Sequence, residues 1–104
     1  MTTPSQTLRD LAGLGQQPAA LKESALIMID LQNTYRHGVM QLTGVEAAIA
    51  EAKMLLEMAR DLKVPVIHIR HDGGPGSPYD LSAEIGAISR EVAPIAGEPV
   101  ITKN

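Results

Sequence analysis

The feature that most constrains the fold is a strand–helix–strand pattern in the middle of the chain. Residues 25–29 are five consecutive apolar residues, which is typical of a strand covered on both faces. Apolar residues then recur every three or four positions over residues 45–62, which predicts a helix. It must end near Lys63, because the residue before Pro65 is pushed out of the helical region. Residues 66–70 form a β-branched run that predicts a second strand, parallel to the first, with a right-handed crossover.

Less regular segments flank this unit. Residues 99–102 predict a third strand, and residues 82–92 predict a helical turn or two. Residues 1–24 are polar and interrupted by Pro and Gly, so we expect an N-terminal arm with a short helix over residues 7–14 that Thr7 could cap. Residues 25–104 are then part of one α/β domain. Three parallel strands with one long helix leave a sheet face uncovered, so the remainder belongs to a longer chain or to another copy.

Composition narrows the classes of function. The net charge is −3 and no Lys/Arg cluster occurs, which argues against binding to nucleic acid or to an anionic membrane. The longest apolar run is far shorter than the roughly 20 residues of a spanning helix, and the N-terminus lacks the pattern of a secretory signal. We therefore expect a cytoplasmic protein.

The absence of cysteine excludes disulfides and a thiol nucleophile within these residues. Two tyrosines as the only aromatic residues predict a thin core that other chains or further sequence would complete. We expect a homo-oligomer.

Charged residues follow all three predicted strands. In open parallel sheets the functional crevice lies at the carboxyl ends of the strands. This rule selects Asp30 after the first strand, residues 70–72 after the second and Lys103 after the third. A carboxylate beside an ammonium group can serve as a base or a proton carrier next to a fixed positive charge. The simpler interpretation is that Asp30 caps a turn and Lys103 is a solvated chain end.

Other motifs fit known sites less well. Residues 30–34 resemble the phosphatase signature Asp-x-Asp-x-Thr, but Gln32 replaces the second acid, and an amide cannot be a general acid. Residues 73–76 are rich in glycine, but they lack the Lys-Ser/Thr of a phosphate loop. The three histidines show no metal-binding spacing, so we predict no metal and no cofactor. His68 is expected to be a packed, hydrogen-bonded core side chain, whereas His71 and Asp72 at the rim are candidates for binding metal or substrate.

Three segments resemble the isochorismatase-like cysteine hydrolases. Residues 25–35, Ala-Leu-Ile-Met-Ile-Asp-Leu-Gln-Asn-Thr-Tyr, look like the first strand and catalytic-Asp loop of that family. Residues 65–71 resemble its second strand, and residues 94–103 resemble the stretch that leads to its catalytic lysine. The three segments occur in the family's order and spacing, and together the resemblance spans roughly residues 25–104.

The resemblance implies a three-layer α/β/α fold with a parallel sheet, and a triad of Asp, Lys and Cys. Carried over to this sequence, Asp30 is the catalytic acid/base, Lys103 is the catalytic positive partner, and Tyr35 lies where the family often has an aromatic residue near the substrate. The nucleophilic cysteine is expected beyond residue 104. Metal-binding members carry Asp-x-His after the second strand, and this chain has Asp72 followed by two glycines instead.

We therefore predict a hydrolase that acts on a small amide or a related C–N bond. The expected partner is a small-molecule substrate, with no nucleic acid and no membrane. The alternative is a non-catalytic fold fragment or an oligomerisation module that partner chains complete.

Overall fold

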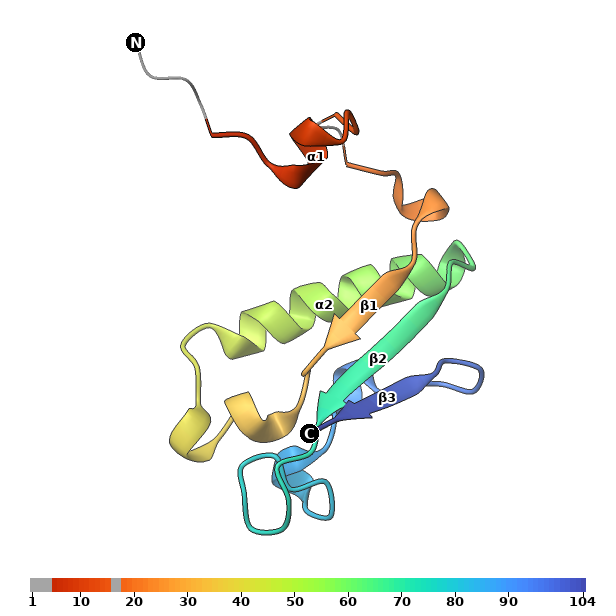
Figure 1. The fold of residues 1–104 in the computed structure, drawn as a ribbon. Helices are drawn as coiled ribbons and strands as arrows, with labels where there is room; N and C mark the ends of the chain where they lie inside the picture. The colour runs from red at the N-terminus through yellow and green to blue at the C-terminus, as the bar shows by residue number, and fades with distance from the viewer. Residues whose placement is uncertain (1–4, 16–17) are drawn as a thin grey trace.

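The computed structural model describes residues 5–15 and 18–104 of the chain. Its centre is the predicted strand–helix–strand unit: β1 (Leu26–Ile29), α2 (Val45–Asp61) and β2 (Val66–His71). A third strand, β3 (Val100–Lys103), pairs with the far side of β2. Both pairings are parallel and the strand order is β1-β2-β3 (Figure 1). The predicted α/β architecture with a parallel sheet is confirmed.

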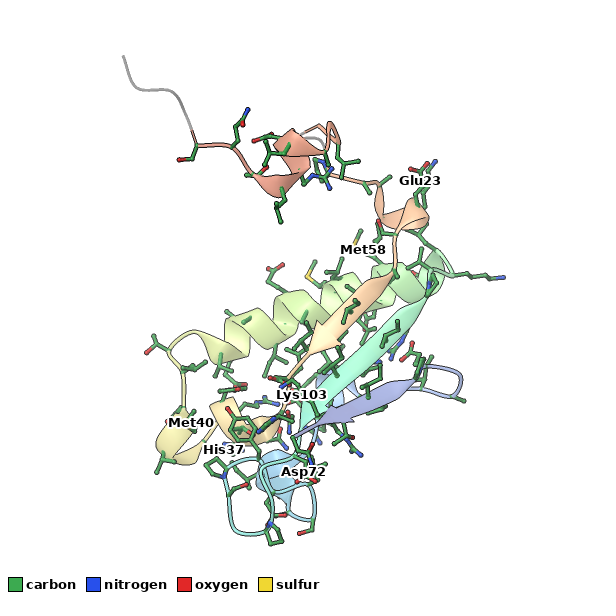
Figure 2. The ribbon with its side chains drawn as sticks, viewed as in Figure 1. Glu23, His37, Met40, Met58, Asp72 and Lys103 are labelled. Carbon is green, nitrogen blue, oxygen red and sulfur yellow. The ribbon has the colours of Figure 1, made fainter. Side chains whose placement is uncertain are left out.

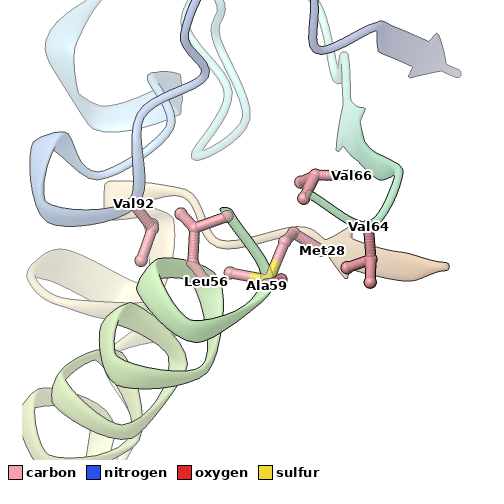
Figure 3. Packing of buried hydrophobic residues seen from close by; sticks show 6 residues of the cluster. All are labelled: Met28, Leu56, Ala59, Val64, Val66 and Val92. Carbon is pink, nitrogen blue, oxygen red and sulfur yellow. The ribbon is translucent and has the colours of Figure 1, made fainter. Parts of the chain in front are cut away.

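Helix α2 covers one face of the sheet. Its buried residues Ile49, Leu56 and Ala59 recur at helical spacing and form the face that packs inward. The core (Figure 3) combines residues from β1, α2, β2, the loop before β2 and the short helix over residues 90–92: Met28, Leu56, Ala59, Val64, Val66 and Val92. The helix ends at Asp61, close to the predicted end. Lys63 adopts the left-handed conformation, with φ of 58°, in the position where many helices have glycine.

The opposite face of the sheet is open in the part of the chain that the structure describes. Ile27, Ile29 and Ile101 are each at least half exposed, although β-branched apolar residues in a parallel sheet are ordinarily covered. The described residues therefore supply two layers of the predicted three-layer arrangement, namely the sheet and the helix layer formed by α2.

The segment between β2 and β3 contains the helical turns that the sequence predicts. They are two 3₁₀ helices within residues 82–92, η4 (Glu84–Gly86) and η5 (Arg90–Val92). Gly86, the last residue of η4, passes so close to the backbone of Asp80 that a Cβ at this position would overlap it. Two further 3₁₀ helices, η2 (Asn33–Tyr35) and η3 (Gly38–Met40), follow β1. These short turns shape the carboxyl end of the sheet.

The N-terminal arm leads away from the sheet (Figure 1). It contains α1 (Leu8–Leu11) and the 3₁₀ helix η1 (Leu21–Glu23), and α1 buries none of its residues. Thr7 caps α1 as expected, because its hydroxyl accepts a hydrogen bond from the Asp10 N–H at 3.1 Å. The helix is shorter than the predicted span of residues 7–14. None of the helices in the described residues is both long enough and apolar enough to cross a membrane.

Candidate functional site

Asp30 is the first residue after β1 and has an unusual backbone conformation. Its φ is 55°, in the left-handed region that side chains other than Asn and Asp seldom adopt. Its N–H still donates to the Ile69 carbonyl at 2.8 Å, so the backbone turns only after the last hydrogen bond to β2. Such strained conformations are concentrated at functional sites. The turn directs the partly buried Asp30 carboxylate along the carboxyl end of the sheet.

Lys103, at the end of β3, meets this carboxylate. The Lys103 ammonium donates to Asp30 Oδ2 at 2.9 Å, with the two side chains 47% and 23% exposed. Asp30 Oδ1 is buried and, among the described residues, has no hydrogen-bond partner. The pairing of His71 with Lys103 across β2 and β3 places the lysine at this end of the sheet, and Figure 2 shows Lys103 and Asp72 there. The structure thus brings together two of the three strand-end groups selected from the sequence.

Gln32 fixes the loop that follows Asp30. Its side chain is almost fully buried, and its Nε2 donates to the carbonyls of His71 at 2.9 Å and Gly86 at 2.7 Å. Its Oε1 accepts from the His71 N–H at 2.9 Å. One amide therefore ties the end of β1 to the end of β2 and to η4. In the sequence Gln32 stands out only as a missing acid, and no local signal reveals its structural role.

Tyr35 lies beside Tyr79, a residue that no sequence motif marks as part of a site. The hydroxyl oxygens of Tyr35 and Tyr79 are 2.6 Å apart, and the two rings meet edge to face. The His71 ring also meets Tyr79 edge to face, at 4.9 Å between centroids. Burial, the hydrogen bond and charge of Tyr79, and the negative charge of Asp30 raise the pKa of Tyr35 to about 12. Tyr35 is thus a neutral hydrogen-bonding group at neutral pH, near enough to Asp30 to sense its charge.

Arg36, in the loop that follows β1, forms ion pairs with two glutamates. Arg36 Nη2 lies 2.6 Å from Glu46 Oε1 on α2 and 2.8 Å from Glu91 Oε2 on η5. The Arg36 guanidinium, helped by a backbone N–H, lowers the pKa of Glu91 to about 2. A hollow of about 560 Å³ lies beside this pair, between residues 33–37 and 84–91. Neither Asp30 nor Lys103 lines this hollow, so it is separate from the Asp30–Lys103 pair.

The remaining rim candidates have local roles. Asp72 Oδ1 accepts a hydrogen bond from the Gly74 N–H at 2.9 Å, within the turn that follows β2. His71 contributes its ring to the contact with Tyr79. Within the described residues, no three His, Cys, Asp or Glu side chains come together as a possible metal site.

His68 occupies the position expected from its place in a strand. It is 1% exposed, and its Nε2 lies 2.9 Å from Glu98 Oε1. The prediction of a packed, hydrogen-bonded core histidine is confirmed. The sequence gives no indication of its partner, because Glu98 is 30 residues away in the chain.

The Asp30–Lys103 arrangement suits acid–base chemistry. An ionised carboxylate next to an ammonium group can accept a proton and later return it, while the ammonium stabilises negative charge that develops nearby. The nearby phenol of Tyr35 offers a neutral hydrogen bond.

Comparison with known proteins identifies the matching family. Residues 24–104 match the model of the Isochorismatase domain. A secreted isochorismatase effector of Verticillium dahliae is 29% identical over 99 residues, which cover 94% of this chain and 52% of that protein. An uncharacterized isochorismatase family protein of Bacillus subtilis is 36% identical over 84 residues, which cover 78% of this chain and 47% of that protein.

Solved structures agree with this match. The crystal structure of an isochorismatase from Pseudomonas putida aligns with a TM-score of 0.85 and 36% identity, over 96% of this chain and 52% of that chain. An N-carbamoylsarcosine amidase from Thermoplasma acidophilum shares the fold, with a TM-score of 0.63 and 22% identity over 76% of this chain and 50% of that chain. The chain spans about half the length of the relatives that it matches.

Proposed function

This chain belongs to the isochorismatase family, and from this premise we propose that the protein hydrolyses an amide or a related C–N bond of a small molecule. The observation that carries the proposal is the 2.9 Å contact between Lys103 Nζ and Asp30 Oδ2 at the carboxyl end of the sheet. The partly buried carboxylate and the left-handed conformation of Asp30 support it, because functional sites concentrate such features.

Each group has a defined role in the proposed reaction. A cysteine contributed from beyond residue 104 gives its proton to the Asp30 carboxylate, and its thiolate attacks the carbonyl carbon. When the C–N bond breaks, Asp30 delivers this proton to the leaving nitrogen. Water then attacks the thioester, gives a proton to Asp30 and releases the acid, and the proton returns to the thiolate. The Lys103 ammonium stabilises the negative charge that Asp30 and the reacting carbonyl carry.

Tyr35 has a separate role in the proposal. Its ring and hydroxyl contact the substrate from the side of the η2 turn, while its hydrogen bond with Tyr79 fixes its orientation. Because its pKa is raised to about 12, it donates or accepts a hydrogen bond at neutral pH without becoming charged.

Ammonia release by the full-length protein tests the proposal. The substrates are acetamide, benzamide and N-carbamoylsarcosine, and the product is measured in a coupled ammonia assay. We expect Asp30→Asn to lower kcat by about 10²–10⁴-fold, because proton transfer by a positioned side chain contributes about that much. Asn tolerates the left-handed conformation, so the fold should survive the change.

Asp61→Asn is the matched control, because Asp61 is an exposed residue at the end of α2. It should retain the wild-type rate. A folded wild-type protein that releases no ammonia from any of these amides would contradict the proposal, as would near wild-type turnover by Asp30→Asn.

A further inference from the structure

Strand β3 carries Lys103, yet none of its residues is fully buried. All four residues of β3 are exposed in the structure. A strand is ordinarily held in register by the side chains that it buries, and a slip of one residue would turn every side chain to the other face. Such a slip would turn Lys103 away from Asp30. Besides the backbone ladder, a side-chain hydrogen bond from Arg70 Nε to Thr102 Oγ1 at 2.9 Å joins β2 to β3.

A nearly buried charge cluster lies immediately before β3. The Glu98 side chain is 9% exposed and accepts from Arg60 of α2 through Nε at 2.8 Å and Nη2 at 2.7 Å. Its Oε1 also lies 2.9 Å from His68 Nε2 of β2 and 3.1 Å from the Ile95 nitrogen. Arg60 Nη2 reaches the Ala93 carbonyl as well, at 3.0 Å. One carboxylate therefore joins the helix, the central strand and the loop that leads into β3.

The protonation state of Glu98 agrees with this role. Hydrogen bonds from Arg60, and also from His68 and the Ile95 N–H, hold its pKa at about 2 against the opposing effect of burial. Glu98 is therefore ionised at neutral pH and only accepts hydrogen bonds. It follows that His68 Nε2 carries the proton in their contact. Hydrogen bonds to a charged group are stronger than neutral ones, which suits a residue that holds a loop in place.

The cluster is directly connected to the backbone pairing that places Lys103. The His68 N–H donates to the Pro99 carbonyl at 2.9 Å, next to Glu98 in the chain. At the other end of β3, the Asp72 N–H donates to the Lys103 carbonyl at 2.8 Å. Between them His68 pairs with Val100 and His71 pairs with Lys103. Fixing the loop at Glu98 thus fixes where Lys103 stands along β2.

We propose that Glu98 is a positioning residue for Lys103: by joining Arg60 and His68 to the loop before β3, it holds β3 in register and keeps the Lys103 ammonium at the Asp30 carboxylate. The effect of Glu98 on catalysis rests on the proposed hydrolase function, whereas its effect on the position of Lys103 does not depend on that function. Glu98 lies on the α2 side of the sheet and has no contact with Asp30 or Lys103 among its hydrogen bonds.

The first test measures placement without any substrate. Amide hydrogen exchange is followed by NMR in the full-length protein with Glu98→Gln, which preserves the size of the side chain. The amides of His68 and Asp72, which bond to carbonyls at the two ends of β3, should exchange at least about tenfold faster than in wild type. The amides of Leu26 and Asp30, which bond β1 to β2, should be unchanged.

Glu91→Gln is the matched control, because it removes an equally acidic partner of a different arginine, Arg36. It should leave the His68 and Asp72 amides protected. If Glu98→Gln fails to fold, Arg60→Lys replaces it, because lysine keeps the charge but cannot bond Glu98 through two nitrogens. Unchanged exchange at His68 and Asp72 in the folded variant would overturn the inference.

The second test asks whether Glu98 acts through Lys103. On the amide that the wild type hydrolyses fastest, Glu98→Gln should lower kcat by about 10–100-fold with KM within about twofold. In a Lys103→Ala background the same substitution should change kcat by less than about twofold, because two residues that act through one contact are not additive. Additive losses would overturn the inference. Absence of turnover in the wild type would count against the proposed function alone, and hydrogen exchange would still decide the role of Glu98.

Discussion

Lys103 and Asp30, 73 residues apart in the chain, form a 2.9 Å hydrogen bond at the carboxyl end of the parallel sheet. The contact occupies one oxygen of Asp30, while the other oxygen is buried and, within the described part of the chain, makes no hydrogen bond. The carboxylate is therefore held in place by a positive charge on one side and keeps a second oxygen available to accept a proton.

Removing the Lys103 ammonium should slow catalysis strongly. In the full-length protein, Lys103→Ala should lower kcat by about 10²–10³-fold, the typical loss when one group that stabilises transition-state charge is removed. The fold should remain intact, because the side chain is 47% exposed. Lys53→Ala removes an exposed lysine of α2 and should leave the rate unchanged. Steady-state kinetics provide the comparison, and a Lys103→Ala rate close to wild type would exclude Lys103 from the mechanism.

Replacing Gln32 should destabilise the protein. Gln32→Leu leaves the carbonyls of His71 and Gly86 and the His71 N–H without their partner, and burial keeps water from replacing it. We expect a loss of about 2–4 kcal/mol in the free energy of unfolding, measured by urea denaturation. Gln41→Leu, at an exposed position, should change it by less than about 0.5 kcal/mol. Equal effects of the two substitutions would contradict the role of Gln32.

Removing the Tyr79 hydroxyl should lower the pKa of Tyr35. Tyr79→Phe eliminates a hydrogen bond and a charge that both raise this pKa, whereas burial and the charge of Asp30 remain. The pKa should therefore fall from about 12 but stay above the ordinary value of 10.0. NMR titration of the Tyr35 ring carbons resolves this value. A pKa that does not move would show that the 2.6 Å contact is absent in solution.

Acid should weaken the fold partly through Glu98. Its folded-state pKa of about 2 lies below the ordinary value of 4.5, so the stability that it contributes is full above pH 4.5 and is lost as the pH falls toward 2. Urea unfolding at a series of pH values should show this decline. In Glu98→Gln the decline should be shallower over the same interval, because that proton is no longer taken up on unfolding. Parallel curves for the two proteins would contradict the prediction.

Shortening a leucine of α2 should lower the free energy of unfolding strongly only where the side chain is buried in the core. Leu56 is fully buried in the core, whereas its neighbour Leu55 is 40% exposed. Leu56→Ala should lower the free energy of unfolding by about 2–5 kcal/mol through lost burial and the resulting cavity. Leu55→Ala removes the same atoms from the exposed side and should cost much less. Thermal or urea unfolding measures both, and similar losses would mean that α2 packs on a different face.

The regular elements could be predicted because their signals are local. The continuous apolar run before Asp30 predicts a covered strand, and the three- and four-residue spacing from Val45 onward predicts a helix that the structure places at Val45–Asp61. Residues 82–92 contain the predicted helical turns, but the sequence does not reveal their 3₁₀ geometry, because the close approach of Gly86 to Asp80 is a tertiary constraint.

The sequence by itself determined the parallel strand–helix–strand unit and placed Asp30 and Lys103 at the ends of their strands, because hydrophobic periodicity and the rule for carboxyl ends need no distant information. Only the tertiary structure decided which side chains meet. Tyr79 lies 44 residues from Tyr35, and Glu98 lies 38 residues from Arg60. Contacts over such distances depend on how the loops close around the sheet, and a polar side chain in a loop carries no periodic signal that reveals its partner.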